Sequence, residues 1–328
     1  MKLSKTLIAA SVLAASSLVA VAAFAQAAWP SKPISLVIPF AAGGPTDVVG
    51  RVIAASMTKS TGFPVIVENK VGAGGTVAAA YVKNAKPDGY IFFLHHNGMA
   101  TAPALYRKLS FNPLTDFEYI SQVVDVPMTV VARKDFPAKD IKELITYVKA
   151  NNVKINLGNA GLGAVSQLCG MMLQKALGVS LTTVPFSGTG PAMNALVGGQ
   201  IDLMCDQTTN TLAQAESGGI KLYAVTTAKR IASLPKTPTL AESGLAGFEV
   251  VVWHGIYAPK GTPKAITEKF NHMIRNALKD PEVIKNLTKL GAVQVADSKL
   301  TPAGLQTWLT SELDKYVPMI RAAGQYAD

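Results

Sequence analysis

Two glycine-rich turns contain the residue types that most clearly suit chemistry. The first is Pro39–Asp47 (PFAAGGPTD), after the apolar run Ile34–Ile38, and the second is Gly158–Ser166 (GNAGLGAVS), after Val153–Leu157. Each pattern predicts a strand, a tight turn and a helix start. The first N–H groups of a helix lack acceptors within it and lie at the positive end of its dipole, which favours an anion. Two such turns, far apart in the chain, predict a cleft that holds an anion from both sides.

Neutral groups must supply most of the binding, because neither turn contains lysine or arginine. Asp47 is expected to support the helix start, since a carboxylate facing an anionic ligand would repel it. Arg51 lies four residues further along the helix and is expected to pair with Asp47 at the surface. The Thr46 hydroxyl can either cap the helix or donate into the cleft.

The histidine pair and the two cysteines allow several interpretations. No carboxylate or cysteine lies at ligand spacing from His95 and His96, and neighbouring strand residues point to opposite faces, so we predict no metal site. One of the two histidines could line the cleft. Cys169 and Cys205 are the only cysteines and could form a disulfide or remain two buried thiols. No motif places a histidine beside Cys205, so a nucleophile there is not supported.

The sequence lacks the motifs that are typical of nucleotide-binding proteins and of serine hydrolases. The chain has no phosphate loop ending in GK[ST], neither turn contains G-x-G-x-x-G, and the second turn lacks the G-x-S-x-G elbow of hydrolases. Basic residues are scattered over helices rather than clustered with aromatic residues, which gives no support for nucleic-acid binding. We therefore expect no catalysis, no cofactor and no nucleic-acid partner.

Strand-like runs alternate with helical periodicity, which predicts an α/β fold with parallel sheets and a ligand at the carboxyl ends of strands. The predicted strands are Ile34–Pro39, Val65–Glu68, Tyr90–Leu94, Thr129–Arg133, Lys154–Leu157, Thr182–Pro185, Ile201–Cys205, Lys221–Thr226 and Val250–Tyr257. The predicted helices are Thr46–Thr61, Gly75–Ala85, Ala138–Ala150, Ser166–Leu177, Pro191–Val197, Lys264–Lys279, Pro281–Leu290 and Pro302–Ala323.

The alternation also predicts two lobes. The chain is expected to cross to a second lobe near Val126–Thr129 and to return near Val250–Trp253, so that the purely helical part after Pro263 packs on the first lobe. This gives residues 29–127 plus 251–328 for lobe I and residues 128–250 for lobe II.

The first residues have the pattern of a secretory leader. Lys2 and Lys5 precede the apolar run Leu7–Val21, and the small residues that follow predict cleavage after Ala25 or Ala27. An uncleaved membrane anchor is the alternative, but the apolar run is short. The net charge is +10 for the full chain and 10 − 2 = +8 without the two leader lysines. We expect residues 1–25 to be a signal peptide and the mature protein to be a soluble periplasmic monomer.

An ordered set of motifs along the whole mature chain resembles the Bug/TctC family, the extracytoplasmic solute receptors of tripartite tricarboxylate transporters. The motifs are Trp29–Asp47 (WPSKPISLVIPFAAGGPTD), Gly72–Thr76 (GAGGT), Lys86–Tyr90 (KPDGY), Val184–Ala192 (VPFSGTGPA) and Thr237–Gly244 (TPTLAESG). The resemblance implies a two-lobed Venus-flytrap fold, like type II periplasmic binding proteins. It also implies a small organic acid held between the lobes by backbone amides and bridging waters, and a membrane permease as partner.

By position, the resemblance implies a set of ligand-binding residues from both lobes. They are Phe40, Ala42, Gly43, Gly44, Thr46, Asp47, Thr76, His96, Asn97, Gly161, Gly163, Ala164, Ser166, Phe186 and Asp206. The chain departs from the family pattern at Ala164–Gln167, where a Ser-Pro-Ser-His-like run is common, at Cys205–Gln207, where Phe-Asp-Asn is commoner, and at His95–His96, where smaller residues are usual. These departures leave the identity of the acid open.

The sequence thus predicts a periplasmic receptor that captures a di- or tricarboxylate, or an aromatic carboxylate, and has no enzymatic activity. Two alternatives share features of this prediction. A ligand-loaded partner of a membrane sensor kinase would use the same cleft, and a secreted α/β hydrolase would act on a carboxylate ester.

Overall fold

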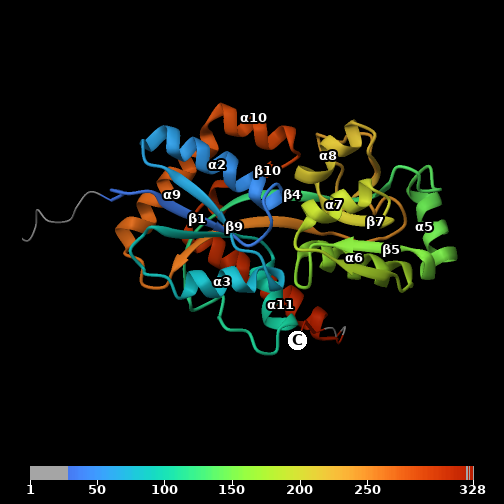
Figure 1. The fold of residues 1–328 in the computed structure, drawn as a ribbon, viewed down its shortest axis with the longest axis horizontal. Helices are drawn as coiled ribbons and strands as arrows, with labels where there is room; N and C mark the ends of the chain where they lie inside the picture. Colours follow the sequence, from blue (N-terminus) through green and yellow to red (C-terminus); the bar gives the residue numbers. More distant parts are fainter. Residues whose placement is uncertain (1–28, 323, 325, 328) are drawn as a thin grey trace, which may run out of the picture.

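The chain folds into two α/β lobes that lie side by side and are joined by two long strands (Figure 1). The computed structural model describes residues 29–322, 324, 326 and 327, so the predicted leader and its cleavage site lie outside the described residues. The joining strands are β4 (Phe117–Arg133) and β9 (Val251–Pro259), which run antiparallel. Within the described residues, no helix is both long and apolar enough to span a membrane.

The first lobe is built on three parallel strands, with β1 (Ile34–Ile38) between β2 (Val65–Asn69) and β3 (Ile91–His95). Its helices are α2 (Pro45–Thr61), α3 (Thr76–Lys83), α4 (Gly98–Leu105), α9 (Lys264–Lys279), α10 (Pro281–Lys289) and α11 (Pro302–Ala322). Helices α9 and α10 pack on α2, and α11 packs on α4 and β4. The prediction that the C-terminal helices return to the first lobe is therefore confirmed.

The second lobe has three parallel strands, with β5 (Asn156–Asn159) between β6 (Thr182–Pro185) and β7 (Leu203–Gln207). Strand β8 (Ile220–Val225) pairs with β4. Its helices are α5 (Ile141–Asn151), α6 (Val165–Leu177), α7 (Thr189–Val197) and α8 (Thr208–Glu216). Short 3₁₀ turns occur at Ala73–Gly75, Asn152–Lys154 and Asp297–Lys299, and a two-residue strand, β10 (Val293–Gln294), pairs with β4.

Strand β4 changes partners where it passes from one lobe to the other. Over Phe117–Pro127 it pairs with β9, and from Met128 onward it pairs with β7 and β8. Both pairings are antiparallel, so the sheets are mixed rather than purely parallel as the alternation predicted. The sequence prediction located only the last five residues of this strand and missed α4 and α8.

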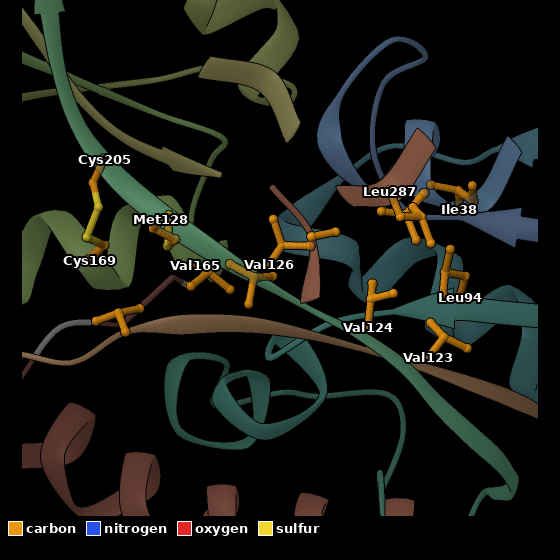
Figure 2. Packing of buried hydrophobic residues seen from close by; sticks show 14 of the residues in the cluster. Ile38, Leu94, Val123, Val124, Val126, Met128, Val165, Cys169, Cys205 and Leu287 are labelled. Carbon is orange, nitrogen blue, oxygen red and sulfur yellow. A yellow bond between two sulfur atoms is a disulfide. The ribbon is translucent and has the colours of Figure 1, made fainter. Parts of the chain in front are cut away.

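Buried side chains along β4 join the two lobes into one core (Figure 2). Val124 and Val126 pack in the same cluster as Ile38 and Leu94 of the first lobe. Met128 continues this cluster toward Val165, Cys169 and Cys205 of the second lobe (Figure 2). Because successive strand residues face opposite sides, an apolar run this long can be buried on both faces at the junction.

A disulfide joins Cys169 of α6 to Cys205 of β7, an outcome that the sequence left open. The two Cα atoms are 6.0 Å apart, within the usual range for a disulfide, and both residues are fully buried. The bond ties the helix that follows the second glycine-rich turn to the strand that ends beside Asp206. It therefore connects two segments that the sequence predicted to line the cleft.

We expect the double variant Cys169→Ala/Cys205→Ala to lose about 4 kcal/mol in free energy of unfolding. The bond closes a loop with a sequence separation of 36, and constraint of the unfolded chain by a loop of that size gives this order of magnitude. Urea unfolding of wild type and variant, each with and without a thiol reductant, measures the effect. The reductant should destabilise only the wild type, and a difference below about 1 kcal/mol would contradict this assignment.

Candidate functional site

A small cavity lies between the two lobes, with a volume of about 20 Å³. The first lobe contributes Phe40, Ala41, Gly44, Pro45, Thr46 and His96, and the second contributes Ala160, Ala164, Val165, Ser166, Thr189, Asp206 and Gln207. Among these lining residues none is lysine or arginine. The space is enough for about one water molecule, so the lobes lie close together in this conformation.

Four helices begin at the wall of this cavity. Their N-cap residues are Gly44 for α2, Ala164 for α6, Gly188 for α7 and Gln207 for α8. None of these four N-caps makes a side-chain capping hydrogen bond. The first N–H groups of each helix therefore keep no partner from a cap, and four positive dipole ends meet in one place. The sequence predicted three of these helices, α2, α6 and α7, but expected an anion at the starts of α2 and α6 alone.

Asp47 supports the first turn from within α2. Its Oδ2 accepts from the backbone N–H of Gly43 (2.9 Å) and from Nε of Arg51 (2.7 Å), and its Oδ1 accepts from Nδ2 of Asn69 (2.9 Å). Burial raises the pKa of this carboxyl, but the hydrogen bonds from Arg51, Gly43 and Asn69 lower it more, so the net shift is downward. The predicted helix-start role and the predicted Arg51 pairing are both confirmed, and Asp47 does not line the cavity.

The second turn corrects the expectation that its amides are unpaired. The N–H groups of Ala160, Gly161 and Gly163 donate to the side chains of Ser166, Asn159 and Gln167 at 2.8, 2.9 and 2.7 Å. The backbone N–H groups that remain available are those of the first residues of α6, because these groups have no acceptor within the helix. Two of these residues, Val165 and Ser166, line the cavity.

Two residues with hydroxyl groups line the cavity from opposite lobes. Ser166 Oγ accepts from Ala160, so its own O–H can donate elsewhere. Thr46 Oγ1 is buried and lies 3.2 Å from Nε2 of His254. Thr46 makes no helix cap, and donation from its hydroxyl to a ligand stays a prediction.

His95, His96 and His254 lie together in the first lobe and are almost fully buried, and of the three His96 lines the cavity. The rings of His95 and His96 are 4.9 Å apart, because β3 ends at His95 and the alternation of strand faces does not extend to His96. Burial lowers the pKa of His95 and of His254 to about 3 and lowers that of His96 strongly as well, so all three rings are neutral. Within the part of the chain that the structure describes, no cluster of three or more histidine, cysteine or acidic residues could hold a metal ion.

Asp206 is the one carboxyl group of the cavity wall. It is fully buried, and burial raises its pKa to about 7 even though it accepts hydrogen bonds from the Gln207 backbone and from Asn210 and Thr189. Near neutral pH this group can therefore gain or lose a proton. In its protonated form it carries no charge and does not repel a bound anion.

The cavity brings together seven of the residues that the resemblance implied. They are Phe40, Gly44, Thr46, His96, Ala164, Ser166 and Asp206. The other eight, which do not line it, are Ala42, Gly43, Asp47, Thr76, Asn97, Gly161, Gly163 and Phe186.

Several residues outside the cavity have clear structural roles instead. Phe186 packs against an apolar cluster of the second lobe, and Thr76 donates to the carbonyl oxygen of Ala73 at 3.0 Å. Asn97 fixes the start of β9, because its Nδ2 donates to the Val251 carbonyl (3.1 Å) and its Oδ1 accepts from the Trp253 N–H (3.2 Å).

Six lining residues were not among the ligand-binding residues that the resemblance implied. They are Ala41, Pro45, Ala160, Val165, Thr189 and Gln207. Four of them lie within the two glycine-rich turns. Thr189 is the first residue of α7, and Gln207 ends β7 and is the N-cap of α8.

Comparison with known proteins identifies this architecture. Residues 49–324 match the family model described as the tripartite tricarboxylate transporter family receptor, TctC. The structure of the periplasmic binding protein BugD superposes with a TM-score of 0.88 at 51% identity, covering 91% of this chain and 99% of that one.

Two further structures carry named ligands. MatC of Rhodopseudomonas palustris, with bound malate, gives a TM-score of 0.85 at 40% identity over 89% of this chain and all of its own. Another R. palustris protein, with adipate, gives 0.86 at 31% identity over 90% of this chain and 98% of its own.

The fold and the cavity define a periplasmic solute-binding protein of the type II kind. The chain belongs to the TctC family of tripartite tricarboxylate transporter receptors. The resemblance read from the motifs is thereby confirmed. Membership of this receptor family also confirms the prediction that the protein is not an enzyme.

We expect the free energy of unfolding to fall as the pH rises from about 4 to about 7, because of Asp206. Its pKa is about 7 in the folded protein against an ordinary value of 3.8, so the folded state holds the proton over a range in which the unfolded chain has lost it. Each pH unit in this window costs up to about 1.4 kcal/mol. Urea unfolding at pH 4.5, 5.5 and 6.5 measures the slope, which should be shallower in Asp206→Asn. An identical slope in that variant would refute the raised pKa.

Proposed function

We propose that this protein captures a small organic acid in the cavity between its lobes and delivers it to the membrane permease of a tripartite tricarboxylate transporter. Malate and adipate, the acids in the two R. palustris structures, indicate the ligand class, a small di- or tricarboxylate, with an aromatic carboxylate as a further candidate. The observation on which the proposal depends is that four uncapped helix starts meet at one cavity without a cationic side chain.

Energetic magnitudes favour binding by both lobes together. Micromolar affinity corresponds to about −8 kcal/mol, and association itself costs on the order of 4–15 kcal/mol. A hydrogen bond to a charged group contributes roughly 1.5–3 kcal/mol. Three such bonds from one lobe barely offset the cost of association, whereas donors from both lobes, in a cavity that excludes water, can reach the required total.

The lobes also contact each other beside the cavity. The Thr101 hydroxyl of α4 donates to the Gly163 carbonyl, and the Tyr106 hydroxyl donates to the Leu162 carbonyl, both at 3.1 Å. These bonds join the first lobe to the second glycine-rich turn. Because the cavity in this closed arrangement is smaller than a dicarboxylate, we propose that the lobes separate to admit the ligand and close over it.

We also propose boundaries for the two lobes and a cleavage site for the leader. We place the lobe boundaries at residues 29–127 plus 251–328 and at 128–250, because β4 exchanges its partners at Met128. Removal of the leader after Ala25 or Ala27 would release a monomeric receptor into the periplasm. The ligand-binding residues that we propose are the seven predicted residues in the cavity wall, together with the six other residues that line it.

Point variants test the neutral-donor site. Thr46→Val and Ser166→Ala each remove one hydroxyl from the cavity, and we expect each to weaken binding by about tenfold or more. Calorimetric titration with succinate, malate, citrate and adipate, after a thermal-shift screen of mono-, di-, tricarboxylic and aromatic acids, gives the affinities. Arg51→Gln is the matched control, because Arg51 lies on the surface of α2, outside the cavity. A large loss in that control would show that the site lies elsewhere.

Closure is tested by small-angle X-ray scattering with and without a saturating acid from that screen. We expect the ligand-free protein to populate an open, more extended form, and the radius of gyration to decrease on saturation. Thr101→Val, which removes one bond between the lobes, should shift the ligand-free protein further toward the open form. Identical scattering curves with and without ligand would reject closure.

A further inference from the structure

We propose that His96 is a specificity-determining residue that donates a hydrogen bond to the bound anion from a neutral ring, locked as the Nε2–H tautomer by the backbone of Gly98. The inference rests on the proposed carboxylate-binding function and assigns a chemical role to one residue of that site. Three observations lead to it, namely the partner of one ring nitrogen, the packing of the ring and the charges around it.

The hydrogen bond to Gly98 determines which ring nitrogen carries the proton. The backbone N–H of Gly98 donates to Nδ1 of His96 at 3.0 Å. A nitrogen that accepts must keep its lone pair, so Nδ1 carries no proton, and a neutral imidazole then carries its proton on Nε2. Because His96 lines the cavity, Nε2–H is the donor that its ring can offer to a ligand there.

Packing holds the ring in place on a second side. His96 stacks on Phe40, with ring centroids 4.7 Å apart and an interplanar angle of 15°. Phe40 belongs to the first glycine-rich turn and lines the same cavity, while Gly98 is the first residue of α4. The ring is thus fixed between two segments that both border the site, and only 3% of the residue is exposed.

The surroundings keep the ring neutral. A proton on Nδ1 would face the Gly98 N–H and replace a hydrogen bond with two opposed donors. The titratable neighbours are His95 of β3 and His254 of β9, whose ring centroids lie 4.9 and 6.0 Å away, and Asp206 on the opposite cavity wall. Both histidines are themselves neutral, and burial lowers the pKa of His96 further.

A locked neutral donor has a defined selectivity. It can donate to a carboxylate oxygen but cannot accept from an ammonium or hydroxyl group placed at the same point. It also adds a donor without adding charge, in a cavity wall that contains no lysine or arginine. The contribution of His96 to binding should therefore remain constant between pH 6 and pH 8.

Three variants separate this role from simple packing. His96→Phe keeps an aromatic ring for the stack on Phe40 and removes the donor. His96→Gln replaces the ring with an amide whose NH₂ group can reach the position of Nε2. His272→Phe is the control, because His272 is an exposed histidine of α9, outside the cavity.

Calorimetric titration with succinate, malate and adipate at pH 6, 7 and 8 is the binding readout. We expect His96→Phe to weaken binding at least tenfold at every pH, His96→Gln to recover part of the loss, and His272→Phe to bind as the wild type does. A His96→Phe variant with unchanged affinity would overturn the inference and leave the proposed function standing. A wild type that binds none of these acids, nor any acid in the wider screen, would overturn the proposed function itself.

Nitrogen-15 NMR of the histidine rings reads the tautomer without any ligand. We expect the ring signals that disappear in His96→Phe to show a protonated Nε2 and an unprotonated Nδ1 from pH 6 to pH 8. A protonated Nδ1, or an imidazolium in this range, would overturn the inference whatever the binding results.

Discussion

Backbone N–H groups at the starts of α2, α6, α7 and α8 converge on one cavity, and no side-chain cap accepts a hydrogen bond from them. A buried donor without an acceptor costs free energy comparable to a lost hydrogen bond. Elsewhere a side-chain cap meets this need, as Asp140 does for α5 by accepting from the N–H groups of Lys142 and Glu143. The four helices at the cavity lack such caps, and in the proposed function a bound anion takes this role.

Side chains near the cavity mainly orient the backbone rather than supply charge. Asp47 uses its carboxylate to hold the first turn, Arg51 neutralises it from the surface, and Gln167 and Ser166 hold the second turn. This arrangement keeps the charges of Asp47 and Arg51 out of the cavity wall. In the proposed function, an acid would be bound through neutral donors, and no ion pair with lysine or arginine would have to be broken on release.

The two crossing strands couple the lobes mechanically. The apolar core continues along β4 from one lobe to the other, so the strands themselves form a packed junction rather than a flexible linker. Asn97 clamps the start of β9 directly beside the cavity residue His96, and its Nδ2 also lies 3.3 Å from Oε2 of Glu312 in α11. The proposed movement of the lobes would therefore involve residues adjacent to the cavity.

The sequence by itself determined the α/β class, the two glycine-rich turns, the absence of a cation in them and the family. The turns are local features, since a strand, a glycine turn and a helix start are encoded by consecutive residues. The family was identified from a set of motifs spread along the chain. The sequence prediction failed for the first part of β4, where Pro127 interrupts the strand pattern, and for α8, which begins with the poor helix formers Thr208, Thr209 and Asn210. Only the tertiary structure decided that α7 and α8 also begin at the cavity, that Cys169 and Cys205 are bonded, and that Phe186 and Thr76 do not line the cavity. Each of these depends on contacts between segments distant in the chain, and a pattern of neighbouring residues does not record the distance between such segments.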